Sequence, residues 1–342
     1  MNLGKKAIAA GMAAGLTIMS ACGVDGQESE TIELTVASGI PAENVFVRDY
    51  LEPFFAEIEE ATDGSVKFEH FPGGQLGSVQ DAVTTVTSGV ADMSYFMPGN
   101  DPGSHPMTAA LTSMPGLYPS SQAGTKAIYE VSQEGPVYEN DYARHGIIPL
   151  LKFATPPYEI WSTGPRIDSP DDLRDLRVRN TGGAIGEYLS FVQSNPTQMD
   201  TTEIFGALDG GVIDALALDA VNLESFSLDT LVERGTKGLA LTGGTFGYIM
   251  NESAWDRLDD DQQSIVAEAA ANLMDRYAQY QDENDALLKN SDQFASIEFV
   301  EMDSSTIAAW EQSFDDFKSG YLEARDDEFR QVYDDFVQRA QQ

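Results

Sequence analysis

The strongest constraint on the fold is a repeated change of hydrophobic period between strand-like and helix-like segments. Residues 32–36 alternate apolar and polar side chains, residues 44–62 place apolar side chains on one helical face, and residues 65–71 alternate again. A helical pattern over residues 79–88 and a buried strand over residues 90–96 continue the series. Strands that alternate with helices at this spacing predict an α/β fold with a largely parallel sheet and helices on its faces.

The rest of the chain repeats this theme and adds one long helix. Short strands are expected at 159–163, 177–179 and 212–218, and a helix is expected at 202–208. Residues 258–287 begin with a cap of acidic side chains and then keep apolar residues at a spacing of about 3.5 residues. A helix of this length, in a chain too large for one simple core, predicts two lobes that share the helix as a strut.

The N-terminus has the pattern of an export signal. Residues 1–21 start with Lys5 and Lys6, continue with an uncharged apolar run, and end in small residues before Cys22, the single cysteine. This pattern resembles a bacterial lipobox, so we expect a signal peptide over 1–21, lipidation at Cys22 and a tether over 22–31. The alternative is a soluble secreted protein with an incidental cysteine. We favour the anchor, because a free thiol is a liability in an oxidising compartment, and predict an extracytoplasmic protein held to the membrane only by lipid.

Composition excludes several classes of partner. The chain has 56 acidic and 20 basic residues, a formal charge of −36. Removal of residues 1–21 takes away two lysines and no acid, which leaves 56 acids, 18 bases and a charge of −38. This excess repels nucleic acid and anionic lipid, so neither is expected to bind. The three histidines, His70, His105 and His145, form no i, i+4 pair, and the sequence has no P-loop, dinucleotide or nucleophile-elbow motif. We therefore expect no metal, no cofactor and no enzymatic activity.

Five collinear stretches carry a resemblance to a known family, and they include Phe-Pro-Gly-Gly-Gln-Leu-Gly and Leu-Arg-Val-Arg. They are 63–67 with 71–77, 86–93, 169–179, 203–214, and 250–252 with Trp255 and 258–263. Together they resemble the extracytoplasmic solute receptors of tripartite ATP-independent periplasmic (TRAP) transporters, of the dicarboxylate-receptor type. The similarity covers nearly all of the mature chain.

This resemblance implies an α/β, two-lobe, periplasmic-binding-protein-like fold with hinge strands and a long connecting helix. We expect lobe I to comprise 32–155 plus 244–284, and lobe II to comprise 156–243 plus 285–342. The resemblance also implies high-affinity capture of a small carboxylate solute between the lobes and its delivery to the TRAP membrane subunits. Transport is then driven by an ion gradient, and the receptor binds without catalysing a reaction.

Arg179 is the residue expected to clamp the ligand carboxylate. In the family, the last arginine of the Leu-Arg-Val-Arg strand points into the cleft, and a guanidinium offers two parallel donors that match a carboxylate. Asn180 and the glycines that follow it are expected to bring backbone N–H groups close to the anion. For Arg174 and Arg177 we expect pairing with surface acids instead.

Departures from the sialic-acid type of receptor shape the rest of the predicted pocket. Tyr158 stands near the position of a second arginine, and Met97 stands at the position of a glutamate. The loss of these polar groups favours a monocarboxylate with an apolar or aromatic body. The predicted lining is aromatic and apolar: Phe96, Met97, Tyr158, Trp161, Leu218 and Phe246. Each aromatic residue has core packing as its alternative. Asp219 and Asn222 are expected to read an amine or hydroxyl group, and Asp214 to be structural.

Two other functions stay open at the level of sequence. One is a lipid-anchored binding protein for an ATP-driven transporter or a chemoreceptor, which the long C-terminal helix and the Arg179 stretch disfavour. The other is an extracytoplasmic lyase or hydrolase that uses paired carboxylates. Acid pairs are abundant at this net charge, so their presence alone does not indicate catalysis.

Overall fold

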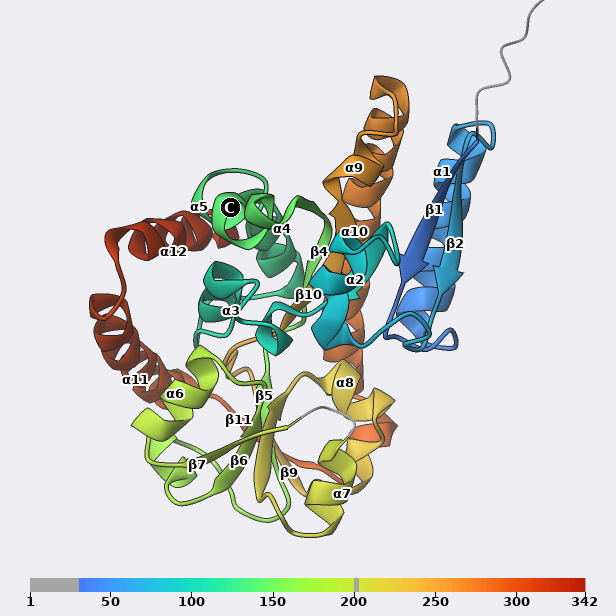
Figure 1. Cartoon of the computed structure of the whole chain (residues 1–342). Helices are drawn as coiled ribbons and strands as arrows, with labels where there is room; N and C mark the ends of the chain where they lie inside the picture. Colours follow the sequence, from blue (N-terminus) through green and yellow to red (C-terminus); the bar gives the residue numbers. More distant parts are fainter. Residues whose placement is uncertain (1–30, 200–202, 342) are drawn as a thin grey trace, which may run out of the picture. The chain divides into compact units, whose positions relative to one another are not determined.

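The computed structural model describes residues 31–199 and 203–341, which contain two β-sheets (Figure 1). The first sheet has the strand order β2-β1-β3-β10-β4. Strands β2, β1 and β3 are parallel, whereas β10 is antiparallel to both β3 and β4. The sheet is therefore mixed, and the expected largely parallel arrangement holds only for its first three strands. The bounds are β1 Ile32–Ala37, β2 Val66–Phe71, β3 Met93–Phe96, β4 Ile147–Ala154 and β10 Thr245–Asn251.

The second sheet has the order β11-β9-β5-β8-β6-β7. Strand β5 is antiparallel to β8 and β9, and the other neighbours are parallel. The strands expected at 159–163, 177–179 and 212–218 are confirmed as β5, β6 and β8. The bounds are β5 Glu159–Ser162, β6 Arg177–Asn180, β7 Asn195–Gln198, β8 Ala215–Leu218, β9 Arg234–Lys237 and β11 Glu298–Glu301.

Helices cover both sheets and connect them. The expected helix at 44–62 is a π-helical turn, Val47–Leu51, that continues as α1. The α-helices are α1 Glu52–Ala61, α2 Ala82–Thr87, α3 Pro106–Thr112, α4 Ser121–Val131, α5 Gly135–Asp141, α6 Ala184–Phe191, α7 Ile204–Asp209, α8 Ala220–Ser225, α9 Glu252–Trp255, α10 Asp260–Leu288, α11 Ser304–Glu323 and α12 Asp327–Ala340. Short 3₁₀ turns lie at Val79–Asp81, Pro98–Asn100, Ala143–His145, Pro170–Leu173, Leu228–Thr230 and Asp292–Phe294.

The long helix α10 is confirmed, and it contacts elements on both sides of the molecule. Its first turn is a capping box, in which the Asp259 side chain accepts from the Gln262 backbone N–H and the Gln262 side chain accepts from the Asp259 N–H. Along its length α10 packs on α1, α4 and β4 and, near its C-terminal end, on α8 (Figure 1). It therefore links the helices of the two sheets, as a strut should.

The hydrophobic core is shared between the sheets. One cluster lies between the first sheet, α1 and α10, and a smaller one fills the second sheet around Trp161. The third and largest cluster contains Phe96 and Ile147 from the first sheet together with Val178 and Ala217 from the second. The described residues accordingly form a single compact unit.

The C-terminal helix does not follow the predicted lobe boundary. All strands of the first sheet lie within the ranges expected for lobe I, and all strands of the second lie within those for lobe II. However, α12 packs against α4 and α5 of lobe I (Figure 1). Phe336 contacts Tyr118 with ring centroids 6.4 Å apart, and Arg339 pairs with Glu130 at 3.0 Å. The assignment of 285–342 to lobe II is therefore incorrect for α12, whose apolar face is covered by α4.

Candidate ligand-binding site

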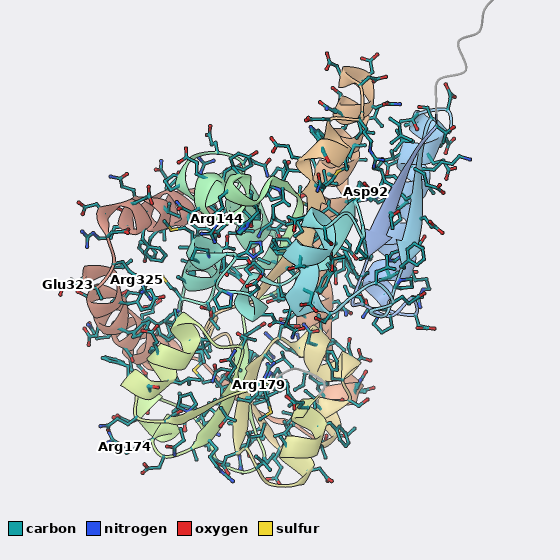
Figure 2. The ribbon with its side chains drawn as sticks, viewed as in Figure 1. Asp92, Arg144, Arg174, Arg179, Glu323 and Arg325 are labelled. Atoms are coloured by element: carbon teal, nitrogen blue, oxygen red, sulfur yellow. The ribbon has the colours of Figure 1, made fainter. Side chains whose placement is uncertain are left out.

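Arg179 is enclosed by protein. It is the third residue of β6, which lies between β7 and β8, and it is 2% exposed. Its Nε and one Nη donate to the Met199 carbonyl at 3.2 and 3.0 Å. Figure 2 shows Arg179 among the strands of the second sheet, whereas Arg174 lies at the periphery. The guanidinium is thus held by its own lobe and kept out of bulk water.

Three candidate residues lie near the same edge of the second sheet. Strands β6 and β8 are parallel, so their carboxyl ends bring Arg179 and Asp219 to the same edge. In the antiparallel β5–β8 pair Glu159 is opposite Leu218, so the register places Tyr158 opposite Asp219. Burial raises the pKa of Tyr158 well above its usual value, Asp219 adds to that rise, and Arg179 opposes it. Both charged groups therefore act on the same phenol.

Asp219 combines this position with a structural bond. It is fully buried, and its carboxylate oxygens accept from the backbone N–H and the side-chain Nδ2 of Asn222, both at 2.8 Å. Burial raises its pKa to about 6; the bonds to Asn222 oppose the rise and the nearby Asp285 adds to it. Asp219 is also the N-cap of α8. Asp219 and Asn222 thus hold each other at the helix start, and a ligand hydrogen bond to Asp219 would use its remaining lone pairs.

Three tyrosines that the sequence analysis did not single out lie near this edge. Tyr95 on β3 and Tyr277 on α10 flank Phe246 at ring distances of 6.0 and 6.2 Å. Tyr158 raises the pKa of both Tyr95 and Tyr118, and Asp219 raises the pKa of Tyr118 and Tyr277, in each case after burial. The signal that could have found Tyr95 is its place one residue before the end of a strand whose carboxyl end faces the other lobe.

Trp161 and Leu218 lie in the core of the second sheet. The Trp161 rings pack edge-on against Phe294 and Phe299, each at 5.9 Å, and its Nε1 donates to the Leu218 carbonyl at 2.8 Å. Gly235 lies directly under the indole and leaves no room for a side chain. These contacts place Trp161 as a core residue, and Leu218 is 3% exposed in the same cluster.

The remaining pocket candidates lie on opposite faces of the first sheet. Phe246 stacks on Phe153 at 5.1 Å in the cluster under α1 and α10, where the half-buried Met97 also packs. Phe96 faces the other side, 4.9 Å from the ring of His105 and 4.6 Å from the Lys152 Nζ. The two phenylalanines therefore cannot line the same face of the sheet.

Asn180 is also bound to the protein itself. Its Oδ1 accepts from the Gly182 N–H at 2.8 Å, and its Nδ2 donates to the Val178 carbonyl at 3.4 Å. Gly182 and Gly183 have φ of +83° and +70°, which the loop after β6 requires and which glycine supplies without strain. Asn180 shapes this loop, and its expected role at the anion stays a prediction.

The surface arginines behave as expected. Arg177 pairs with Asp214 at 2.5 Å, and this pairing lowers the pKa of Asp214. Arg174 lies 3.5 Å from Asp171. A surface depression of about 340 Å³ next to Arg174 and Phe191 shares no residue with the predicted pocket. The pairing of Asp214 with Arg177 agrees with the structural role expected for Asp214.

Several sequence predictions concern the N-terminal residues, membrane attachment and metal binding. Residues 1–21, Cys22 and the tether up to residue 30 lie outside the described residues. None of the helices in the described part of the chain is both long and apolar enough to cross a membrane. Within 31–199 and 203–341, no group of three His, Cys, Asp or Glu side chains could hold a metal ion.

Comparison with known proteins supports the fold and shows the family. A model of the family described as bacterial extracellular solute-binding protein, family 7, matches residues 37–321. A solute-binding protein of Albidiferax ferrireducens is 21% identical over 294 residues, which are 83% of this chain and 84% of the relative. A TRAP solute-binding protein from a marine metagenome, specific for aromatic acid ligands and in complex with metahydroxyphenylacetate, has a TM-score of 0.80 and 21% identity, over 91% of this chain and 98% of that chain. A TRAP protein of Bordetella bronchiseptica with bound mandelate has a TM-score of 0.78 and 23% identity, over 91% and 99%. The predicted two-lobe binding-protein fold is confirmed.

Proposed function

We propose that this chain, which belongs to the bacterial extracellular solute-binding proteins of family 7, captures a monocarboxylate with an aromatic or apolar body for delivery to TRAP membrane subunits. Family membership confirms the resemblance to TRAP solute receptors. The observation that carries the proposal is the buried guanidinium of Arg179 at the sheet edge shared with Tyr158 and Asp219. The family match gives no support to the alternatives of an ATP-driven transporter, a chemoreceptor or a hydrolase.

The physical basis is a single strong cation in an aromatic surrounding. A guanidinium inside protein interacts with a carboxylate through paired, charge-assisted hydrogen bonds, and the low local dielectric strengthens them. The phenol of Tyr158 lies near both Arg179 and Asp219, and the phenols of Tyr118 and Tyr277 lie near Asp219. A flat, apolar ligand body fits such walls better than a heavily hydroxylated sugar acid does. The aromatic monocarboxylates bound by two structurally similar proteins agree with this ligand class.

We further propose that Cys22 is lipidated and anchors the receptor to a membrane. Support comes from the sequence pattern of residues 1–22 alone. Expression of the full chain in a bacterium should place the protein in the membrane fraction, and Cys22→Ser should move it to the soluble fraction. Equal partition of both forms would contradict the anchor.

The ligand proposal is tested by thermal shift and calorimetry with benzoate, mandelate and 3-hydroxyphenylacetate. At least one should stabilise the wild-type protein, because a ligand that binds only the folded state raises its stability. Arg179→Ala should lose about 2–4 kcal/mol of binding free energy, as expected for a truncated charge-assisted pair. Arg179→Lys should keep part of the affinity, because the charge stays while the paired geometry is lost.

Arg177→Ala is the matched control. It removes an arginine two residues away on the same strand, and this arginine pairs with Asp214 at the surface. We expect this variant to bind like the wild-type protein. Equal binding by wild type and Arg179→Ala would remove Arg179 from the site, and binding of sugar acids in preference to the aromatic acids would refute the ligand class.

A further inference from the structure

The last turns of α10 carry three charged residues that contact helices from both lobes. Asp282, Asp285 and Lys289 are spaced by three and four residues, so they share one face of the helix. Asp282 accepts from the backbone N–H groups of Ser121 and Gln122, at the start of α4, at 2.7 and 3.0 Å. One turn later the contacts change to the other lobe.

Asp285, Lys289 and Glu159 form a buried triad. The Lys289 Nζ lies 2.8 Å from Asp285 and 2.9 Å from Glu159, and the three side chains are between 2% and 11% exposed. Burial alone would lower the pKa of Lys289, but the two carboxylates outweigh it and the pKa is raised. Lys289 therefore stays charged between two acids.

Each carboxylate of the triad accepts hydrogen bonds from backbone N–H groups, and each is linked in this way to a segment that holds a candidate ligand residue. Asp285 accepts from the Ala220 N–H at 2.8 Å, and Ala220 directly follows Asp219. Glu159 directly follows Tyr158, and it accepts from the N–H groups of Gly238 and Leu239 at 2.9 and 3.1 Å and from the Thr236 hydroxyl at 2.8 Å. The triad thus ties the two segments that bring Tyr158 and Asp219 to the sheet edge onto one helix.

We propose that the Asp285–Lys289–Glu159 triad positions the ligand site, by fixing Tyr158 and Asp219 relative to each other through α10. Buried charges held by several hydrogen bonds have one permitted geometry, because any displacement leaves a charge unpaired in the protein interior. The triad residues touch the site only through their neighbours, so they are positioning residues. The inference rests on the proposed function for its binding readout, although the geometry of the triad can be tested without a ligand.

The ligand-free test is amide hydrogen exchange in Asp285→Ala, with Asp282→Ala as the matched control. Both variants remove a carboxylate from the N-terminus of a helix, on the same face of α10 and one turn apart. Asp285→Ala should speed exchange at Ala220 and leave Ser121 and Gln122 protected. Asp282→Ala should do the reverse. Unchanged protection of Ala220 in Asp285→Ala would overturn the proposal.

The binding test uses 3-hydroxyphenylacetate and three variants of the full chain. Lys289→Met should weaken binding by about tenfold or more, as removal of outer supporting residues commonly does, and Lys289→Arg should restore most of it. Asp282→Ala should change the affinity by less than about threefold while lowering the melting temperature, since it acts on a cap outside the site. Equal loss of affinity in Lys289→Met and Asp282→Ala would show that the triad has only a structural role.

A double variant separates positioning from general damage. If Lys289 acts through Tyr158, the effect of Lys289→Met should shrink in a Tyr158→Phe background, because coupled residues give non-additive effects. Fully additive losses would contradict the proposal. If the wild-type protein does not bind this probe, the proposed ligand class fails, and the exchange experiment still decides the role of the triad.

Discussion

We predict that the buried lysine of the first sheet contributes a stability that rises with pH. Lys152 on β4 is fully buried, its Nζ donates to the Tyr142 hydroxyl at 2.7 Å, and it lies 4.6 Å from the Phe96 ring centroid. Burial lowers its pKa from 10.5 to about 7, and the charge of Asp141 opposes this only in part. In the unfolded chain the lysine keeps its proton to near pH 10.5, so between pH 7 and 10.5 the unfolded state binds one proton more.

The sign and size of the effect follow from this difference. Because Lys152 is cationic when protonated and its pKa is lowered in the folded state, it destabilises the folded state below pH 7. This penalty disappears as the pH rises toward 10.5. One excess proton gives a slope of about 1.4 kcal/mol per pH unit, and the whole interval corresponds to about 5 kcal/mol. Lys152→Met removes the titration and loses one hydrogen bond and the cation–π contacts with Phe96 and Tyr142, together worth about 2 kcal/mol. The variant should therefore be about 2 kcal/mol more stable near pH 7.5.

Urea unfolding of wild type and Lys152→Met between pH 7.5 and 9.5 measures this directly. The difference in free energy of unfolding between the two proteins should change by about 2–3 kcal/mol across the range, in favour of the wild type at high pH. Tyrosines and other groups that titrate in both proteins cancel in the difference. Two parallel curves would show that Lys152 is not desolvated and would refute the reasoning.

Three further variants test separate parts of the structure. Asp259→Ala removes the α10 cap, which should cost about 1 kcal/mol in urea unfolding, and Asp259→Asn should keep most of it. Gly243→Ala should cost about 1–3 kcal/mol, because the new Cβ would overlap the Tyr118 hydroxyl; equal stability would mean that the loop moves freely. If the Tyr277 hydroxyl contacts the ligand hydroxyl, Tyr277→Phe should weaken the binding of 3-hydroxyphenylacetate by about tenfold relative to that of phenylacetate. Calorimetry with both acids measures this ratio, and an unchanged ratio would contradict the contact.

Local elements were predictable where one segment carries its own signal. The α10 helix combines a capping box at Asp259 and Gln262 with a long apolar spacing, and both are visible without knowing any partner. The antiparallel strand β10 was not predicted, because its neighbours β3 and β4 lie about 100 to 150 residues earlier in the chain. Strand pairing at such separations depends on the complete fold. The placement of α12 on α4 escaped prediction for the same reason.

The candidate site shows the same limit at the level of single residues. Tyr95 and Phe96 are neighbours on β3 and point to opposite faces, and both faces of the sheet are covered by apolar helices. Hydrophobicity therefore does not tell whether Tyr95 or Phe96 points toward the other lobe. Arg179 was singled out through the family resemblance of its Leu-Arg-Val-Arg stretch, and the structure places its side chain in the interior; its role at the ligand stays a prediction. Trp161 is a residue type common in ligand pockets, but its indole packs directly on Gly235 in the core of the second sheet.

The net negative charge of the chain opposes the binding of an anionic ligand, and the burial of Arg179 offsets this effect. A formal charge of −36 repels a carboxylate at long range, so long-range attraction cannot be what selects the ligand. That repulsion acts through water and decays within about 10 Å at 0.1 M salt, whereas a contact with a buried guanidinium is screened much less. An acidic receptor can therefore hold an anion more tightly with a buried cation than with an exposed one. Arg179 is buried and donates to the Met199 carbonyl, whereas the more exposed Arg177 pairs with Asp214. Of these two arginines on one strand Arg179 is the buried one, and for this reason we propose it as the partner of a ligand carboxylate.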